Sequence, residues 1–261
     1  MSVESTPGAP VLTVVQLDEV VPLDRFAGWL EGVDVRLVRA WAGEQAAPAA
    51  TLGGLLVLGG RMSAHAEAEP GITATRALLA DAVAADLPTL GLCLGAQLLA
   101  VATGGRVHVD APPGREAGIV DVRWRPEATG DPLVGALAAA GRSTPMPTMH
   151  ADAIVDLPRG ATWLAASRMY PYQAFRTGSA WGLQFHPEAS PALMHAWAVD
   201  AAEGARPDET AATGQDGAVD RSRAEVAAID DAVAAHDAAV AHAGQTLART
   251  FATLVVARAA R

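Results

Sequence analysis

In Pro88-Thr89-Leu90-Gly91-Leu92-Cys93-Leu94-Gly95-Ala96-Gln97-Leu98-Leu99-Ala100, a short apolar strand passes through a tight Gly-x-Cys-x-Gly corner into a helix. Glycines on both sides of such a corner avoid clashes between strand and helix, and they let the central residue adopt a strained conformation with its side chain pointing outward. The amide of Leu94 then lies in the first turn of the helix, where unpaired N–H groups and the helix dipole favour a thiolate and can also bind an oxyanion. An isolated cysteine is usually an inert buried thiol. The two flanking glycines, Gly91 and Gly95, instead predict that Cys93 is a nucleophile.

Composition excludes several classes of protein. The chain has 261 residues, enough for one large domain or a domain with an appendage. Its net charge of −10 argues against nucleic-acid binding, and all 19 basic residues are Arg, which excludes a Schiff-base lysine and a Walker-type phosphate loop. No apolar run is long enough to cross a membrane, and Met1 to Pro10 does not resemble a signal peptide. The single Cys suits a reducing compartment, so we expect a cytoplasmic protein without disulfides.

Apolar runs alternate with helical spacing in the first hundred residues. The expected strands are 11–17, 33–38, 54–58 and the run before Cys93, and the expected helices begin at Pro22, at Ile72 and directly after Cys93. This alternation predicts a parallel sheet covered on both faces, with a ligand at the carboxyl ends of its strands. Because Gly59-Gly60 and Cys93 both follow such strands, we expect them to be neighbours in space.

After Gly105 the chain changes to short extended pieces, which predict an antiparallel or mixed half. These pieces are 106–109, 118–124, 148–155, 162–167, 172–176 and 180–185. The last one leads into Phe185-His186-Pro187-Glu188. In an extended segment, residues i and i+2 point to the same side, so His186 and Glu188 can act together. Alone this motif is also compatible with a surface turn, but a thiol nucleophile needs a base, and the base needs a carboxylate to orient it.

The combination of Cys93, His186 and Glu188 resembles the triad-type class I glutamine amidotransferases. The shared motifs are the G-x-C-x-G-x-Q corner, the upstream Gly-Gly and the H-P-E after the last core strand, and the likeness extends from about Val11 to Ala202. Within that superfamily, the chain looks similar to stand-alone proteins related to the glutaminase domain of GMP synthase. The resemblance implies a flavodoxin-like three-layer α/β sandwich with a mostly parallel central sheet.

The resemblance also implies roles for residues around the nucleophile. The amides of Gly60 and Leu94 would form the oxyanion hole, and Gly59 and Gln97 would be substrate-binding residues, with Gln97 in contact with bound glutamine. Arg61 stands where the family often has Pro. It would either bind a substrate carboxylate or be a solvated loop charge.

A second group of residues matches the family near the substrate. The stretch Met149-His150-Ala151-Asp152 resembles a W-H-x-D element, with Met149 in place of Trp, so His150 and Asp152 are expected substrate-binding residues. Glu116 and Gly118 resemble a structural E-x-G element. The remaining histidines have no ligand spacing, so we expect no metal site.

The C-terminal part is expected to be separate from the catalytic region. We divide the chain into a catalytic domain, residues 1–204, a linker, 205–220, rich in Gly, Asp, Thr and Pro, and a helical extension, 221–261. Val226, Val233, Val240, Leu247 and Leu254 recur every seven residues, but the alternate core positions are poor for a coiled coil. Two interpretations stay open: a helix, or a hairpin broken near Gly244, that docks on its own core, and a helix that contacts a partner or a second copy.

Together these features predict a cofactor-independent glutaminase reaction through a γ-glutamyl thioester on Cys93. No synthetase half is recognisable in the chain. Three hypotheses follow: a protein that supplies ammonia to a separate synthetase, a self-sufficient γ-glutamyl hydrolase or peptidase, and a non-catalytic binding or regulatory protein on the same fold. The complete triad counts against the third.

Overall fold

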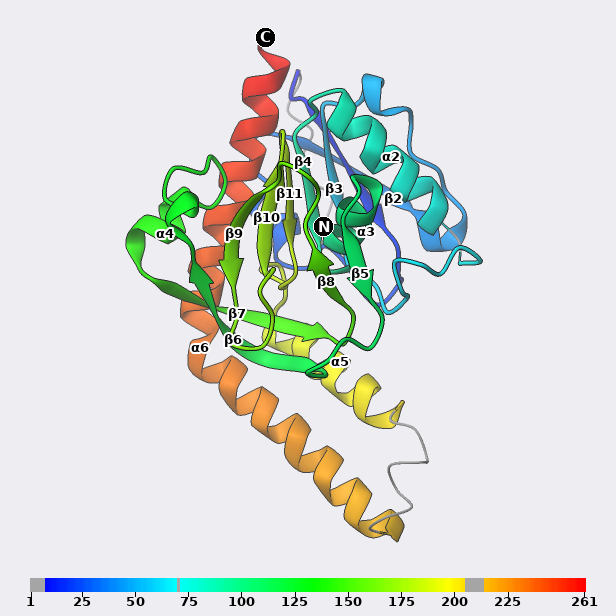
Figure 1. Cartoon of the computed structure of the whole chain (residues 1–261), viewed down its shortest axis with the longest axis vertical. Helices are drawn as coiled ribbons and strands as arrows, with labels where there is room; N and C mark the ends of the chain where they lie inside the picture. Colours follow the sequence, from blue (N-terminus) through cyan, green and yellow to red (C-terminus); the bar gives the residue numbers. More distant parts are fainter. Residues whose placement is uncertain (1–7, 70, 205–213) are drawn as a thin grey trace.

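The computed structural model describes residues 8–69, 71–204 and 214–261, with side chains from Asp220 onward in the last segment. Within these residues a nine-stranded sheet has the order β2-β1-β3-β4-β11-β10-β9-β6-β7, and β5 pairs with β8 in a small second sheet (Figure 1). The main sheet is formed by β1 (Val11–Gln16), β2 (Asp34–Arg39), β3 (Gly54–Val57), β4 (Thr89–Leu92), β6 (Glu116–Trp124), β7 (Ser143–His150), β9 (Thr162–Ala166), β10 (Ala174–Thr177) and β11 (Ala180–Leu183). The small sheet is formed by β5 (Arg106–His108) and β8 (Ala153–Asp156).

The sheet has a parallel half and an antiparallel half, as the sequence predicts. Strands β2, β1, β3, β4 and β11 are parallel neighbours, and β10, β9, β6 and β7 continue the sheet in antiparallel pairs. The piece expected over 148–155 is wrong in detail, because residues 151–152 separate β7 from β8 and send them into different sheets. A helix within 118–162, α4 (Gly135–Ala140), was not predicted; its small Gly-Ala composition gives a weak apolar pattern.

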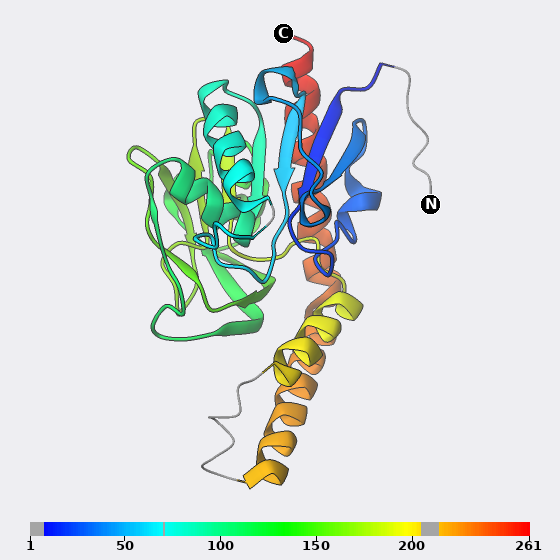
Figure 2. The ribbon, with the colours of Figure 1, turned by 90° about the vertical axis from the view of Figure 1, so that its right-hand side faces the viewer.

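Helices cover both faces of the parallel half and produce three layers (Figures 1 and 2). Alternate side chains of β3 point to opposite faces: Leu55 packs with α2 (Ile72–Ala84) and α3 (Leu94–Ala102), and Leu56 packs in the other core layer. The continuous apolar runs in the sequence are therefore strands buried on both sides. This architecture confirms the expected flavodoxin-like α/β sandwich.

The second core layer is filled by the C-terminal helix rather than by the expected helix near Pro22. Only one turn, α1 (Phe26–Trp29), forms there. The 46-residue helix α6 (Gly214–Ala259) supplies Leu247, Phe251 and Val255 to the same core cluster as Phe26, and all three are fully buried. Because α6 occupies this face, the β1–β2 connection has no room for a long helix.

The amino-terminal half of α6 pairs with α5 (Pro191–Glu203), and the two helices extend below the sheet as an arm (Figures 1 and 2). Ile229 and Val233 of α6 are buried in a cluster with Met194 and Trp197 of α5. The hydrophobic stripe thus packs within its own chain, and the helix continues through Gly244 without a break. The expected linker is wrong for 214–220, which are helical, and its other residues, 205–213, lie outside the described part of the chain.

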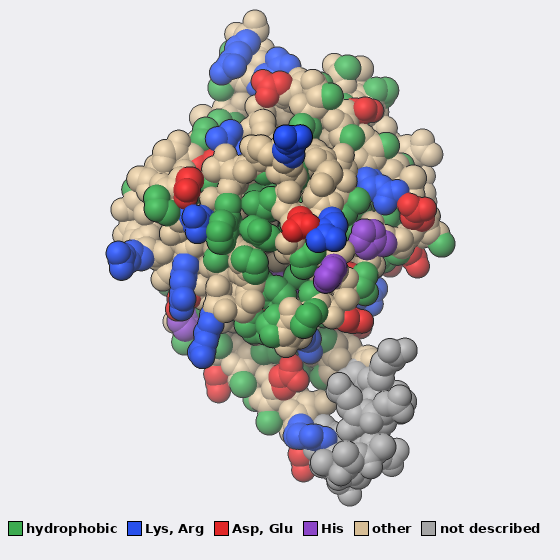
Figure 3. Space-filling view, viewed as in Figure 1, with side chains coloured by type: hydrophobic (Ala, Val, Ile, Leu, Met, Phe, Trp, Pro, Cys, Tyr) green, Lys and Arg blue, Asp and Glu red, His purple; other side chains and the backbone are tan. Residues whose placement is uncertain are grey.

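The surface view places hydrophobic side chains near the middle of one face, over the antiparallel strands (Figure 3). On this side, the ribbon shows no described helix in front of β9 and β10 (Figure 1). No helix in the described part of the chain is both long and apolar enough to cross a membrane.

Candidate active site

Cys93 lies at a strained corner between β4 and α3. Its backbone has φ 49° and ψ −106°, a conformation that residues with a side chain rarely adopt. A Cβ on Gly91 would lie 2.5 Å from the Gly95 carbonyl oxygen, and one on Gly95 would collide with the carbonyl of Val57, so both positions require glycine. The Cys93 N–H donates to the Leu183 carbonyl at 2.8 Å, which ties the corner to β11. The fold therefore maintains the strained geometry at the thiol from both sides.

His186 and Glu188 follow β11 and form a buried pair. The distance from His186 Nδ1 to Glu188 Oε1 is 2.7 Å, and both side chains are almost fully buried. The backbone N–H of His186 donates to the Pro147 carbonyl at 2.8 Å, which fixes this segment to β7. Burial alone would lower the pKa of His186, but the negative charges of Glu188 and Cys93 outweigh it and raise the pKa to about 10. The ring is therefore an imidazolium at neutral pH.

The thiol and the imidazole meet at the Gly59-Gly60 segment, as the sequence predicts. A Cβ on Gly59 would lie 2.9 Å from His186 Cε1 and 3.4 Å from Cys93 Cβ. A Cβ on Gly60 would lie 2.9 Å from Leu94 Cδ2. Segments that are distant in sequence thus converge around Cys93, and a side chain at either glycine would require a neighbouring side chain to shift.

The Leu94 amide has the environment that an oxyanion-binding group needs. Leu94 is the first residue of α3, and N–H groups in a first helical turn have no partner within the helix. The contact of Gly60 with the Leu94 side chain brings the second expected amide to the same corner. Gly60 and the first residue of α3 therefore lie close together beside the corner that carries Cys93.

Gln184 is a site residue to which the sequence motifs assign no role. Its Nε2 donates to Cys93 Sγ at 3.6 Å, and its Oε1 accepts from Gln97 Nε2 at 3.3 Å. The signal that could have found it is its place two residues before His186, directly after β11. Gln97 Nε2 also donates to the Asp152 carbonyl at 3.0 Å. Gln97 thus lies behind Gln184, with its amide nitrogen already bound by protein atoms.

His150 and Asp152 lie in a buried network around Glu116. His150 contacts Glu116 Oε2 through Nε2 at 3.2 Å and the Asp152 carbonyl through Nδ1 at 3.0 Å. The Glu116 carboxylate also accepts from Ser167 Oγ and from Gln173 Nε2, each at 2.6 Å. This network joins the end of β7 to the loops around β9 and β10. The polar atoms of His150 that could meet a substrate are therefore occupied by protein groups.

Arg61 is a half-exposed loop charge, with 58% of its side chain accessible, and it pairs with Asp18. Its Nε donates to Asp18 Oδ2 at 2.9 Å and its Nη2 donates to Asp18 Oδ1 at 3.2 Å. The fork that would bind a substrate carboxylate is therefore engaged by a carboxylate of the chain itself. Arg61 Nη1 reaches Asp200 of α5 at 3.4 Å.

Trp197 of α5 forms a wall of the site that no sequence motif indicated. Its ring packs against His186 with 4.7 Å between centroids, and its Nε1 donates to the Val20 carbonyl at 2.8 Å. The contact joins elements whose relative position depends on tertiary packing.

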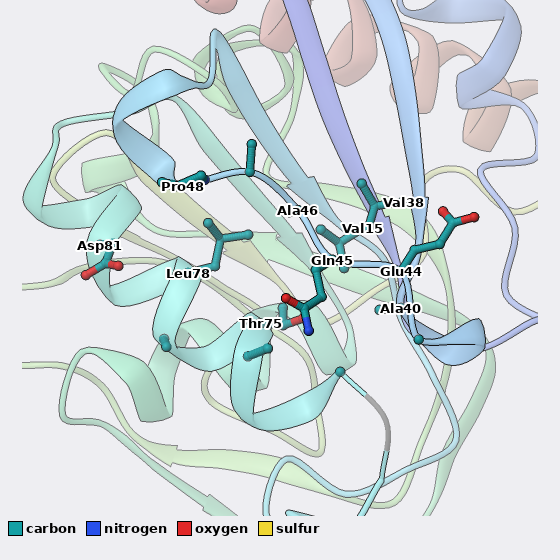
Figure 4. A pocket seen from close by; sticks show the side chains of 15 residues that line it. Val15, Val38, Ala40, Glu44, Gln45, Ala46, Pro48, Thr75, Leu78 and Asp81 are labelled. Atoms are coloured by element: carbon teal, nitrogen blue, oxygen red, sulfur yellow. The ribbon is translucent and has the colours of Figure 1, made fainter.

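A separate pocket of about 650 Å³ lies between α2 and the loop after β2 (Figure 4). Thr75, Leu78 and Asp81 of α2 line one side of it, and Glu44 and Gln45 lie on the other. None of its lining residues belongs to the Cys93 corner or to the His-Pro-Glu segment. Within the described residues, no group of three or more His, Cys, Asp or Glu side chains could hold a metal ion.

Comparison with known proteins gives one family match. The profile of "Glutamine amidotransferase class-I" matches residues 30–199. Over 107 residues the chain is 37% identical to the A subunit of glutamine-hydrolysing GMP synthase from Natronomonas pharaonis and equally to the same-named protein from Halobacterium salinarum. Each alignment covers 40% of this chain, and it spans about half the length of these relatives, 54% and 55%.

Solved structures resemble nearly the whole chain. A glutamine amidotransferase from Thermotoga maritima superposes with a TM-score of 0.67 at 21% identity, covering 93% of this chain and 98% of its own. A glutamine amidotransferase from Methylobacillus flagellatus gives a TM-score of 0.70 at 22% identity, with 94% of each chain covered. At this identity the likeness concerns the fold alone.

Proposed function

The chain belongs to the class-I glutamine amidotransferase family, and from this premise we propose that it hydrolyses the side-chain amide of glutamine with a Cys93-His186-Glu188 triad. One observation carries the proposal: a thiol at a strained corner lies beside an imidazole whose second nitrogen is 2.7 Å from a buried carboxylate. The pair of Cys93 and His186 supplies a nucleophile and a proton donor, and Glu188 orients the ring.

The proposed reaction proceeds in two steps. The Cys93 thiolate attacks the amide carbon of glutamine, and the N–H groups of Gly60 and Leu94 bind the oxyanion that forms. His186 gives its proton to the leaving nitrogen, so ammonia departs and a γ-glutamyl thioester remains. His186 then takes a proton from water as the water attacks the thioester, which releases glutamate and regenerates Cys93.

The proposal includes a partner for the ammonia. The relatives with 37% identity are named as subunits of a glutamine-hydrolysing synthase, so we propose that this chain supplies ammonia to a separate synthetase. The catalytic thiol must stay reduced, which suits a cytoplasmic location. Gln97, His150 and Asp152 support the walls of the glutamine site in this proposal; their engaged polar groups favour an indirect role over direct contact with the substrate.

The test combines turnover with covalent labelling. A diazoketone analogue of glutamine should add once to the wild-type chain, and Cys93→Ser should abolish both labelling and ammonia release. His186→Ala should reduce turnover more than Glu188→Gln, because the base is lost in the first variant and only its orientation in the second. Unchanged turnover in Cys93→Ser would refute the triad.

A second arm separates the two catalytic hypotheses. Ammonia release that increases on addition of a synthetase supports the proposed role. Rapid cleavage of γ-glutamyl peptides by the chain alone, with no response to a synthetase, would instead identify a self-sufficient hydrolase.

A further inference from the structure

The loop after β1 carries a buried carboxylate whose hydrogen bonds converge on the Gly59-Gly60 segment. Only 6% of the Asp18 side chain is exposed. Its Oδ2 accepts from the Arg61 backbone N–H at 3.1 Å and from Arg61 Nε at 2.9 Å, and its Oδ1 accepts from Arg61 Nη2 at 3.2 Å and from the Val20 N–H at 3.3 Å. Four donors therefore fix this carboxylate, and three of them belong to the residue that follows Gly60.

The bond to the Arg61 backbone N–H acts directly on the peptide next to Gly60. That N–H shares a rigid peptide plane with the Gly60 carbonyl, so holding it restricts the rotation of Gly60. Glycine is otherwise the residue with the greatest backbone freedom. A Cβ on Gly60 would also lie 3.5 Å from Asp18 Cβ, so the Asp18 side chain is packed directly against this residue.

The loop that carries Asp18 is itself anchored. Gln16 Nε2 donates to the carbonyls of Asp18 and Glu19 at 3.1 and 3.2 Å, and the Val21 N–H donates to the Asp18 carbonyl at 3.1 Å. Trp197, which packs on His186, donates a hydrogen bond from its Nε1–H to the Val20 carbonyl. Asp18 is thus a fixed support rather than a mobile counter-ion.

The ion pair is formed at neutral pH. Burial alone would raise the pKa of Asp18, but the hydrogen bonds and charge of Arg61 outweigh burial and leave the pKa below its usual value. Asp18 is therefore charged at neutral pH, where it accepts the three bonds from Arg61.

We propose that Asp18 and Arg61 are positioning residues that hold the Gly60 amide toward the oxyanion at Cys93. This inference rests on the proposed function, because it concerns the oxyanion hole of the same reaction. It also argues against the interpretation of Arg61 as a substrate-binding residue, since the Nε and Nη2 edge of the guanidinium that would bind a substrate carboxylate is bound to Asp18. A displaced oxyanion donor weakens binding of the transition state and leaves ground-state binding largely intact.

The test uses Arg61→Met, which keeps the backbone N–H and removes the guanidinium, and Asp18→Asn, which keeps the shape and removes the charge. Full loss of an oxyanion donor costs roughly 10²–10³ in kcat, so we expect a partial displacement to cost about 10- to 100-fold. KM for glutamine should change less than about threefold, because only the transition state is affected. Arg61→Lys should recover part of the loss, since it restores the charge without the fork.

The matched control is Arg39→Met. Arg39 also donates its backbone N–H and a guanidinium nitrogen to one carboxylate, that of Glu44, at 2.8 and 3.4 Å, but both side chains are exposed and distant from Cys93 in the fold. This variant should keep the wild-type kcat. A loss of kcat in Arg61→Met but not in Arg39→Met would therefore be specific to the ion pair beside Gly60.

Two further readouts isolate the oxyanion. Alkylation of Cys93 by iodoacetamide forms no oxyanion, so its rate should be unchanged in Arg61→Met and Asp18→Asn. The acylation burst with p-nitrophenyl acetate does form an oxyanion, so it should slow by the same factor as kcat. A higher KM with unchanged kcat would overturn the proposal by showing that Arg61 binds substrate. A burst equal to that of the wild type, or a parallel loss of alkylation, would also overturn it.

Failure of the proposed function gives a different result. A wild-type chain that alkylates at Cys93 but releases no ammonia from glutamine would refute glutaminase activity. The p-nitrophenyl acetate burst would still decide whether Asp18 and Arg61 position the amide.

Discussion

Gly244 of α6 is the position where one added methyl group should disturb the catalytic pair from a distant part of the chain. A Cβ at this position would lie 2.8 Å from Trp29 Cζ3, 3.3 Å from the Pro187 carbonyl carbon and closer still to the Pro187 carbonyl oxygen. Pro187 stands between His186 and Glu188, and its backbone cannot move away as the end of a flexible side chain can. Gly244→Ala must therefore displace either α6 or the His-Pro-Glu segment.

The expected magnitude combines two opposing effects. In the interior of an unrestricted helix, Gly→Ala stabilises by about 1 kcal/mol. Overpacking in a close contact costs about 1–3 kcal/mol, so the sum is a loss of up to about 2 kcal/mol. In a chain of this size, a loss of about 2 kcal/mol lowers Tm by roughly 4–8 °C, and a smaller loss lowers it proportionately less. A shift near 1 Å in catalytic groups can cost about 10²-fold in rate, so we expect kcat to fall at least about tenfold.

Thermal unfolding and glutamine turnover measure the two effects, and two variants control for them. Gly28→Ala places its Cβ in open space in the single turn α1, so it should keep or raise stability, by up to about 1 kcal/mol, and leave kcat unchanged. Ala239→Gly, at an exposed position of the same helix, should lose about 1 kcal/mol through helix propensity while kcat stays at the wild-type value. Stabilisation of Gly244→Ala, or a kcat equal to that of Ala239→Gly, would refute this reasoning.

Four other predictions concern the pair and the helices that support it. The alkaline limb of the pH–rate profile should lie near pH 10, because the pKa of His186 is raised from 6.5 to about 10. The same shift affects folding: the stability that the charged His186-Glu188 pair contributes is complete below pH 6.5 and is lost as the pH rises toward 10. Glu188→Gln should move that limb to lower pH, because it removes a charge that raises the pKa, and an unmoved limb would contradict the assignment. Trp197→Leu should also lower the limb, whereas Trp197→Phe should preserve it, because an aromatic face stabilises the imidazolium by about 0.5–2 kcal/mol. Removal of residues 206–261 should abolish cooperative unfolding and Cys93 labelling, and a folded, reactive product in size-exclusion chromatography would show that α6 is dispensable.

The local parts of the site could be predicted from the sequence, because their geometry depends on close neighbours in the chain. Gly91 and Gly95 flank Cys93, and the collisions that a Cβ would cause explain why the pattern predicts the corner. His186 and Glu188 are only two residues apart, so the sequence indicates that they can pair, but the structure places them in a turn after β11 rather than in the expected extended segment. Each of these predictions needed no knowledge of tertiary packing.

The contacts that the sequence did not predict join segments without a common periodicity. Asp18 and Arg61 are 43 residues apart, and nothing in either loop indicates that one is the partner of the other. The stripe that contains Val233 and Val240 has the same spacing whether it packs on its own chain or on a second copy. Because α6 fills the face above β1, the helix expected near Pro22 is reduced to one turn.

The C-terminal helix is therefore part of the support of the catalytic groups rather than an addition to them. It reaches the His-Pro-Glu segment by two routes. In the first, Gly244 lies against Pro187. In the second, Asp237 forms an ion pair with Arg25 at 2.7 Å, and the backbone N–H of Arg25 donates to the Glu188 carbonyl at 3.3 Å. Neither route involves the parallel strands that position Cys93. The same helix also packs in the core cluster that contains Leu90 and Leu92 of β4. A displacement of α6 would thus disturb the His-Pro-Glu segment directly, and the strand before Cys93 through the core.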